Sequence, residues 1–310
     1  MGKTKYWNLD TLKAKTHMWT SELTGAYLLP FLIPKQNEHY LDVGSGFSPL
    51  GHALYKHILP LGKIIGIDHD HEIVAEANKF AKEMNRNKNL SFKYGDVYSL
   101  DFPDDRFDAV ICQQLLVNLE NPKKAISEMI RVSKKESGRI LVIENSNLGS
   151  FIHHPALSTE DNIILTNIFQ KILMLGKEKH EQGNTSIGSK IYQLMIEAGL
   201  QNVQSQYLIP IIPEINFLNL NRDLKSSAVY FKQHEEKSKI FKLWAHELLP
   251  KQLSEKEWEF FYQKVFDKKY IENAFQNNLP LIQLVHPYSV TVGWLKKQPK
   301  TQFLNIETFN

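Results

Sequence analysis

A nine-residue stretch, LDVGSGFSP at 41–49, constrains the fold more than any other, because an apolar run ends there at two glycines one residue apart. Residues 40–43 predict a short buried strand, and Gly44 and Gly46 can adopt backbone conformations that other residues rarely reach. Pro49 suits a first helical turn, and residues at helical spacing follow it: Leu50, Ala53, Leu54, His57 and Ile58. A strand, a glycine turn and a helix in this order bring a ligand against bare backbone at a helix N-terminus. The stretch therefore predicts a site for a nucleotide-like cofactor.

Strands and helices continue to alternate after this unit. Further short strands are predicted at 62–68, 90–96, 107–114, 139–145, 201–212 and 289–297. Alternating strands and helices of this length indicate a parallel sheet with helices on both faces.

Three regions are expected from this pattern. Residues 1–35 are predicted to form an N-terminal helical segment or lid. Residues 36–212 and 283–300 are predicted to form the α/β cofactor-binding domain. Residues 213–282, which are rich in aromatic residues and lysine, are predicted to form a helical cap inserted between the last two strands.

Composition and charge narrow the class of protein. The chain has 310 residues, of which 42% are hydrophobic, and its net charge of +3 is too small to indicate a nucleic-acid partner. Cys112 is the only cysteine, which argues against a disulfide framework. The first residues lack the apolar segment of a secretory signal, and no apolar run approaches the roughly 20 residues that cross a bilayer. We expect a cytoplasmic protein without a membrane partner.

The glycine loop by itself leaves two cofactors open. A dinucleotide-binding domain has G-x-G-x-x-G/A here, followed about 20 residues later by an acid that binds the ribose. Gly44 and Gly46 fit this pattern, but Pro49 stands at the third position. Asp68 lies 22 residues after Gly46 and suits either a dinucleotide or another nucleoside cofactor.

Motifs further along the chain resemble the class I S-adenosylmethionine-dependent methyltransferases, in particular their small-molecule branch. DVGSGFS at 42–48 matches the first motif of the family, except that Ser48 replaces the third glycine. Asp68 in GIDHD and the stretch YGDVYSLDFPDDRFD at 94–108 match the next two motifs. LLVNLENP at 115–122 keeps the frame of a later motif, with Asn118 in place of a histidine. The resemblance implies a doubly wound, mostly parallel seven-stranded sheet of the Rossmann-like kind.

The same resemblance implies S-adenosyl-L-methionine as the cofactor and assigns roles to the matching positions. The backbone of residues 44–46 would contact its methionine and ribose portion, and Asp42 would lie near its ammonium group. Asp68 would accept both ribose hydroxyls, and Asp96 would accept the adenine amino group. The implied cofactor residues are Asp42, Gly44, Ser45, Gly46, Asp68, His69, Asp96, Val97 and Gln113.

Candidate substrate residues are less clearly marked. Tyr6 and Trp7 belong to the expected N-terminal lid, Asn118 follows the fourth strand, and Glu144 closes the fifth. No catalytic residue is predicted. No metal site is expected, because His153 and His154 are adjacent in sequence, do not share a helix face and have no acid at a supporting spacing.

The expected function is methyl transfer from S-adenosylmethionine to a small molecule by direct in-line displacement. Two alternatives stay open: a non-catalytic cofactor-binding regulatory protein of the same fold, and a nicotinamide-dependent oxidoreductase. An RNA methyltransferase is a weaker third alternative, since it needs a basic face. The acceptor and the oligomeric state are not predicted.

Overall fold

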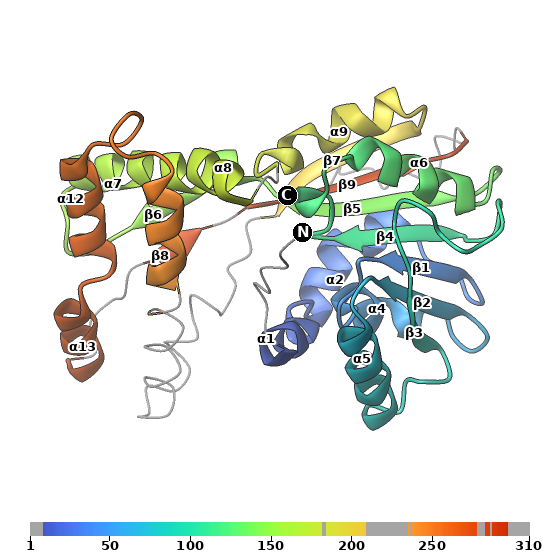
Figure 1. Ribbon diagram of the computed structural model, residues 1–310. Helices are drawn as coiled ribbons and strands as arrows, with labels where there is room; N and C mark the ends of the chain where they lie inside the picture. Colours follow the sequence, from blue (N-terminus) through green and yellow to red (C-terminus); the bar gives the residue numbers. More distant parts are fainter. Residues whose placement is uncertain are drawn as a thin grey trace, which may run out of the picture. The chain divides into compact units, whose positions relative to one another are not determined.

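The predicted strands form one seven-stranded sheet (Figure 1). The glycine loop follows a central strand of this sheet, at the strand's carboxyl end. The strands lie in the order β3-β2-β1-β4-β5-β9-β7. Their bounds are β1 His39–Val43, β2 Lys63–Asp68, β3 Leu90–Tyr94, β4 Ala109–Gln113, β5 Arg139–Asn145, β7 Gln201–Leu208 and β9 Tyr288–Trp294. The neighbours from β3 to β5 all pair in parallel. The predicted doubly wound, mostly parallel seven-stranded sheet is confirmed.

The computed structural model describes residues 9–181, 184–208, 235, 237–277, 283–285 and 287–296. They form two compact units. The α/β unit contains the described parts of 1–144, 190–206 and 289–310, and the helical unit contains those of 145–189 and 207–288. Among the described residues, no helix is long and apolar enough to cross a membrane.

This division differs from the expected boundaries at three places. Residues 145–189, 207–212 and 283–288 were expected within the α/β domain, but their described parts belong to the helical unit. The largest of these segments is 145–189. The physical reason is that Leu165, Ile168 and Phe169 share one hydrophobic core with residues of 237–277. Residues 213–234 of the expected cap lie outside the described residues. That residues 213–282 act as a cap over the cofactor domain stays a prediction.

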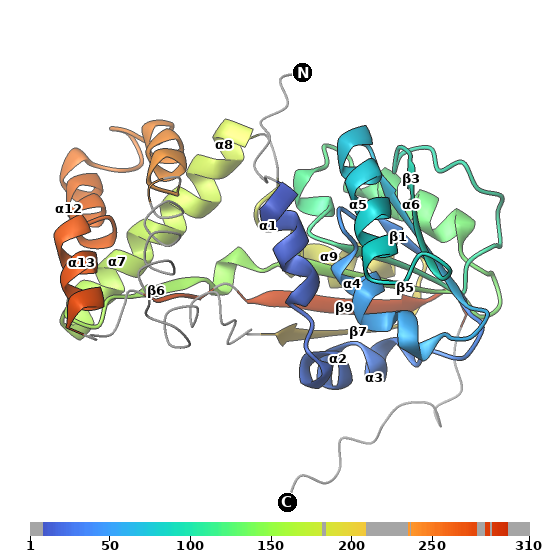
Figure 2. The same ribbon diagram turned by 90° about the horizontal axis from the view of Figure 1, so that it is seen from below.

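Helices cover both faces of the sheet (Figures 1 and 2). Helices α4 (Pro49–Leu54) and α5 (His71–Glu83) lie on one face, and α6 (Pro122–Val132) and α9 (Ile187–Glu197) lie on the other. Right-handed crossovers require this, because the chain leaves β1 toward β2 but leaves β4 toward β5, in the opposite direction. Helix α5 begins after Asp70, whose carboxylate accepts the amides of Glu72 and Ile73, and Asn121 caps α6 in the same way.

An N-terminal segment packs on the α/β unit. It contains α1 (Leu9–Ala14), the short 3-10 helix η1 (Lys15–His17), α2 (Ser21–Tyr27) and α3 (Leu29–Leu32). Figures 1 and 2 both show α1 beside α5. Lys13 Nζ lies 4.6 Å from the centroid of the Phe80 ring and 3.4 Å from the carboxylate of Glu83, which holds α1 against α5.

The strand order of the sheet reverses between β1 and β4. The register places Asp42 of β1 level with Gly66 of β2 and Ile111 of β4, so the carboxyl ends of these strands meet at one edge. Open α/β sheets bind their ligands at such a switch point. The fold thus predicts a ligand site at the loops that follow β1, β2 and β4.

The opposite, amino edge of the sheet contains a buried ion pair. Arg139 donates to both carboxylate oxygens of Glu38, at 2.5 and 3.1 Å, and the hydroxyl of Tyr40 donates to Glu38 at 2.9 Å. Burial, the largest cause, raises the pKa of Tyr40 well above its usual value. These hydrogen bonds connect β1 to β5 past the amino end of β4, the strand that lies between them in the sheet.

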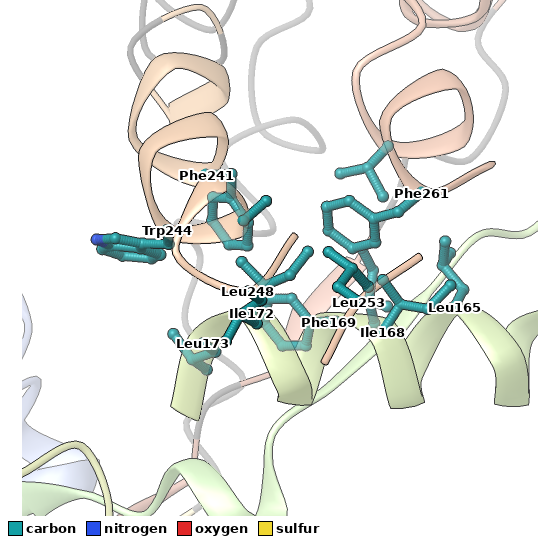
Figure 3. Packing of buried hydrophobic residues seen from close by; sticks show 13 residues of the cluster. Leu165, Ile168, Phe169, Ile172, Leu173, Phe241, Trp244, Leu248, Leu253 and Phe261 are labelled. Carbon is teal, nitrogen blue, oxygen red and sulfur yellow. The ribbon is translucent and has the colours of Figure 1, made fainter. Parts of the chain in front are cut away.

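The helical unit is organised around an aromatic core (Figure 3). Phe169 of α7 stacks on Phe241 and Phe261, with ring centroids 5.9 and 6.5 Å apart. Ser254 and Glu257 form a capping box at the start of α12. The elements of the unit are η4 Asn147–Gly149, β6 Phe151–His153, α7 Thr159–Lys171, the π-helical η5 Ile172–Gly176, α8 Lys177–Glu181, the helical residues 237–246, α12 Glu255–Val265, α13 Lys268–Gln276 and β8 Gln283–Val285.

Candidate cofactor site

The glycine loop after β1 has the conformation that its residues predict. Gly44 and Gly46 have φ values of 63° and 53°, in the left-handed region that favours glycine. A Cβ atom on Gly44 would lie 2.5 Å from Leu115 Cδ1, so a side chain there would also clash. The amide of Ser45 donates to the carbonyl of Ile67 at 2.9 Å, which ties the loop to β2.

Ser48, at the position of the family's third glycine, keeps the backbone shape of a glycine. Its φ of 53° and ψ of 64° are left-handed. Its hydroxyl donates to Asp42 Oδ2 at 2.6 Å and accepts the amide of Gly51 at 3.1 Å, which caps α4. The departure from the motif therefore preserves the turn and adds two hydrogen bonds, a role that motif comparison did not predict.

Asp42 is buried beneath this loop. Burial, the largest cause, raises the pKa of Asp42 from 3.8 to about 7, while the hydrogen bond from Ser48 lowers it and the nearby charge of Asp68 raises it. One of its oxygens is engaged by Ser48. The expected contact of Asp42 with an ammonium group stays a prediction, and a cation at this position would favour the ionised carboxylate.

Asp68 connects the ends of β1 and β2. Its Oδ2 accepts the amide of Gly46 at 2.9 Å, and its Oδ1 accepts the amide of Asp70 at 3.1 Å. The carboxylate is thereby oriented at the loop, and each of its oxygens has two acceptor positions. His69, which is largely exposed, lies with Nδ1 3.4 Å from Asp68 Oδ1. This geometry suits a pair of hydroxyl donors.

Asp96 and Val97 follow β3. Asp96 is exposed, and its Oδ1 accepts the amide of Tyr98 at 2.9 Å, so it orders its own turn. Val97 is buried, with an exposed fraction of 9%. The predicted contacts of these two residues with adenine stay predictions.

Two glutamines at the end of β4 contact the N-terminal segment. Gln113 Oε1 accepts the indole N–H of Trp19 at 3.1 Å, and Gln114 Oε1 accepts Lys15 Nζ at 2.9 Å. Leu12 Cδ2 lies 3.7 Å from the position that a Cβ on Gly46 would take. The segment therefore reaches the loops that follow both β1 and β4.

The predicted lid residues Tyr6 and Trp7 lie outside the described residues. The residues that make the observed contacts are instead Leu12, Lys15 and Trp19, which sequence reasoning did not single out. No local pattern marks them, because Lys15 and Trp19 meet partners 99 and 94 residues further along the chain.

The remaining substrate candidates lie in or beside the turn after β4. Asn118 ends the 3-10 helix η3 (Leu116–Asn118), is exposed, and donates from Nδ2 to the carbonyl of Gln114 at 3.0 Å. Glu144 is fully buried and accepts the amide of Leu116 at 2.6 Å. Both side chains hold this turn in place, and direct contact with a substrate stays a prediction.

The thiol and the two histidines that the sequence singled out are buried or lie in the other unit. Cys112 is fully buried, which raises the pKa of its thiol well above the usual value. His153 and His154 belong to the helical unit. Burial lowers the pKa of His154, whose ring packs 4.4 Å from that of Tyr270. Across the described ranges, no group of three His, Cys, Asp or Glu residues could hold a metal ion.

Comparison with known families agrees with this geometry. The profile of the family described as "Methyltransferase domain" matches residues 34–199, which is more than half of the chain. The chain belongs to this methyltransferase family. The match begins before β1 and ends after α9, so it covers the glycine loop, Asp68 and the ends of β3, β4 and β5.

Several curated proteins are similar to part of this methyltransferase. An uncharacterized methyltransferase of Schizosaccharomyces pombe is 36% identical over 132 residues, which are 41% of this chain and 46% of that protein. The uncharacterized methyltransferase YcgJ of Bacillus subtilis is 34% identical over 119 residues, 37% of this chain and 45% of that protein. A phosphatidylethanolamine N-methyltransferase of Cereibacter sphaeroides is 33% identical over 105 residues, 34% of this chain and 49% of that protein. The chain spans about half the length of the curated relatives it matches.

A solved structure shares the fold. Phosphoethanolamine N-methyltransferase 2 of Haemonchus contortus, in complex with S-adenosyl-L-methionine, superimposes with a TM-score of 0.51 at 14% identity. The superposition covers 96% of this chain and 59% of that chain. At this identity the likeness concerns the fold alone.

S-adenosylmethionine, the cofactor of class I methyltransferases, fits the donors and acceptors of this loop better than a dinucleotide does. A pyrophosphate needs free amides at a helix N-terminus. Pro49, the first residue of α4, has no N–H, and the amide of Gly51 is already bonded to Ser48. Asp68 has a carboxylate oriented by the Gly46 amide, and Gly44 and Gly46 leave bare backbone beside it; its predicted contact with a ribose stays a prediction. Two of the first three residues of α4 therefore offer no free amide to a pyrophosphate, which argues against the nicotinamide-dependent alternative.

Proposed function

We propose that this protein transfers the methyl group of S-adenosylmethionine to a small-molecule acceptor by in-line displacement. The observation that carries the proposal is the hydrogen bond from the Gly46 amide to Asp68 Oδ2, because it joins the glycine loop to the carboxylate that we propose binds the ribose. Family membership and the strand order support the same activity.

The residues of the chain would act mainly by binding and orientation. When bound, S-adenosylmethionine supplies an activated methyl group on a sulfonium, which needs no further activation. Asp68 would hold the ribose hydroxyls, and the backbone of residues 44–46 would hold the amino-acid portion. The end of β4, with Gln113 and Gln114, would border the acceptor. A fixed in-line geometry of this kind converts a bimolecular reaction into an effectively unimolecular one.

A small molecule is favoured as the acceptor over a macromolecule. The net charge of +3 provides no strong attraction for nucleic acid. Curated relatives named as phosphatidylethanolamine, demethylmenaquinone and ubiquinone/menaquinone methyltransferases act on compounds of low molecular mass. A cytoplasmic location is part of the same proposal, supported by a single buried cysteine that suits a reducing compartment.

Calorimetric titration with S-adenosylhomocysteine and with NAD tests the cofactor. We expect S-adenosylhomocysteine to bind and NAD not to bind. Asp68→Ala is expected to weaken binding by about tenfold or more, since a hydrogen bond to a charged group contributes about 1.5–3 kcal/mol. Asp68→Asn is a second variant that keeps an acceptor for the Gly46 amide, so the glycine loop is expected to keep its fold while the charge of Asp68 is lost. Asp101→Asn, in an exposed loop, is the matched control.

Turnover separates the enzyme from a non-catalytic binding protein. Transfer of labelled methyl groups to a pool of small metabolites, lost in Asp68→Ala, is expected. Binding of S-adenosylhomocysteine without transfer to any pool would favour the regulatory alternative. Preference for NAD would overturn the proposal.

A further inference from the structure

The helical unit contains a surface cavity of about 600 Å³. This volume falls within the range of about 300–1,000 Å³ that small-molecule sites occupy. Eight of the described residues line the cavity: five belong to α7, two to η5 and one to α12. None of them belongs to the α/β unit that contains the glycine loop, so the proposed methyl transfer does not account for this cavity.

The cavity is apolar along one face of a helix. Ile164, Ile168 and Leu175 recur at spacings of four and seven residues, which places them on the same face of the continuous α7 and η5. The stretch from residue 164 to residue 175 extends about 16 Å at about 1.5 Å per residue, so the cavity is elongated along the helix. Met174, whose side chain adapts to irregular shapes, lines the same stretch.

The apolar residues form a buried floor and an exposed rim. Ile168 is only 2% exposed and belongs to the aromatic core of the helical unit (Figure 3). Ile164 and Leu175 line the same cavity with exposed fractions of 48% and 42%. A ligand in the cavity would remove apolar surface of both rim residues from water, which favours binding.

Three of the four polar side chains among the described lining residues are bonded to other parts of the helical unit. Lys171 Nζ donates to Glu257 Oε1 at 2.7 Å, and Glu257 Oε2 accepts the amide and the hydroxyl of Ser254, both at 2.8 Å. Gln170 Nε2 donates to the carbonyl of Ser150 at 2.8 Å. The one cation and the one anion of this wall pair with each other, so the wall does not select a charged ligand.

We infer that this cavity binds the hydrocarbon chain of a small lipid-like molecule, whose polar group stays in water. An elongated cavity with an apolar floor and a wall of paired charges matches a hydrocarbon chain better than a charged ligand. A protein partner fits less well, because a stable interface takes about 20–30 residues on each side and eight described residues line this cavity.

Calorimetric titration with hexanoate, octanoate and decanoate, each below the concentration at which it forms micelles, tests the inference. We expect the affinity to rise about fourfold for each added methylene that is buried. The neutral probe 1-octanol is expected to bind within about threefold of octanoate, because the chain and not the head group is recognised.

Substitutions at the rim locate the bound chain. Ile164→Asp and Leu175→Asp each place a charge beside the chain and are expected to weaken decanoate binding by about tenfold or more. Both side chains are on the surface, so the fold should be retained, and the thermal unfolding midpoint of each variant checks this. Ile163→Asp is the matched control, because Ile163 is 57% exposed and is not among the described residues that line the cavity.

Several results would overturn the inference: no binding of decanoate, the same affinity for all three chain lengths, or equal weakening in Ile163→Asp and Ile164→Asp. Sedimentation of the unmodified protein and of Ile164→Asp tests a second copy as the occupant. A dimer that Ile164→Asp dissociates would assign the cavity to self-association and would also overturn it. Affinity for S-adenosylhomocysteine is expected to stay unchanged in these variants, so failure here is distinguishable from failure of the proposed function.

Discussion

Replacement of Asp42 by asparagine is expected to remove a large pH dependence of stability. Asp42 is buried beneath the glycine loop, and its pKa rises from 3.8 to about 7 on folding. Between these values the folded protein holds a proton on Asp42 that the unfolded chain has released. The free energy of unfolding therefore falls as the pH rises through this window, and levels off above the folded pKa. An asparagine side chain cannot ionise, and it keeps an acceptor for the Ser48 hydroxyl.

The size of the effect follows from the shift. A difference of about 3 pKa units at about 1.4 kcal/mol per unit amounts to about 4 kcal/mol. Asp42→Asn should accordingly gain stability relative to the unmodified protein by about 1.4 kcal/mol per pH unit between about pH 4 and 7. The contributions of the other titrating groups to the free energy of unfolding cancel in this comparison, because both proteins contain these groups.

Urea denaturation of both proteins at a series of pH values measures this difference. Asp101→Asn, which removes a carboxylate from an exposed loop, is the control and should follow the unmodified protein. Parallel stability curves for Asp42→Asn and the unmodified protein would refute the argument, since they would show that Asp42 ionises in the folded protein as readily as in the unfolded chain.

Two further predictions concern the loop and the amino edge of the sheet. Ser48→Ala and Ser48→Gly both lose the cap of α4 and the bond to Asp42, but glycine also relieves the left-handed strain, so the alanine variant should be less stable by about 1 kcal/mol in urea denaturation. Equal midpoints would contradict the left-handed geometry. Glu38→Leu leaves the Arg139 charge buried and should cost about 3–5 kcal/mol, of which the double variant with Arg139→Met should recover part. A double-mutant cycle with purely additive losses would show that the two side chains are not coupled.

The sheet and the loop could be predicted because their signals are local. The centre of β4, residues 110–112, is a continuous apolar run, and such runs indicate strands buried on both faces. The left-handed turns at Gly44 and Gly46 follow from the residue type itself. The order of the motifs then placed Asp68 at the end of β2, where the structure has it.

The roles of several candidate residues could not be predicted in this way. Glu144 accepts the amide of Leu116, a contact between β5 and the turn after β4 that periodicity does not reveal, and its contact with a substrate stays a prediction. The boundary of the helical unit was missed for a similar reason. Phe169, within residues 145–189, packs against Phe241 and Phe261, which come much later in the chain.

The sequence by itself determined the strand–glycine–helix unit, the class of the sheet and the family, since these depend on residues that are neighbours in the chain and on their spacing. Only the tertiary structure decided that Ser48 bonds to Asp42, that the Gly46 amide reaches Asp68, and that Lys15 lies on Gln114. Such contacts depend on how strands and helices pack, because packing brings together side chains whose separation along the chain follows no period.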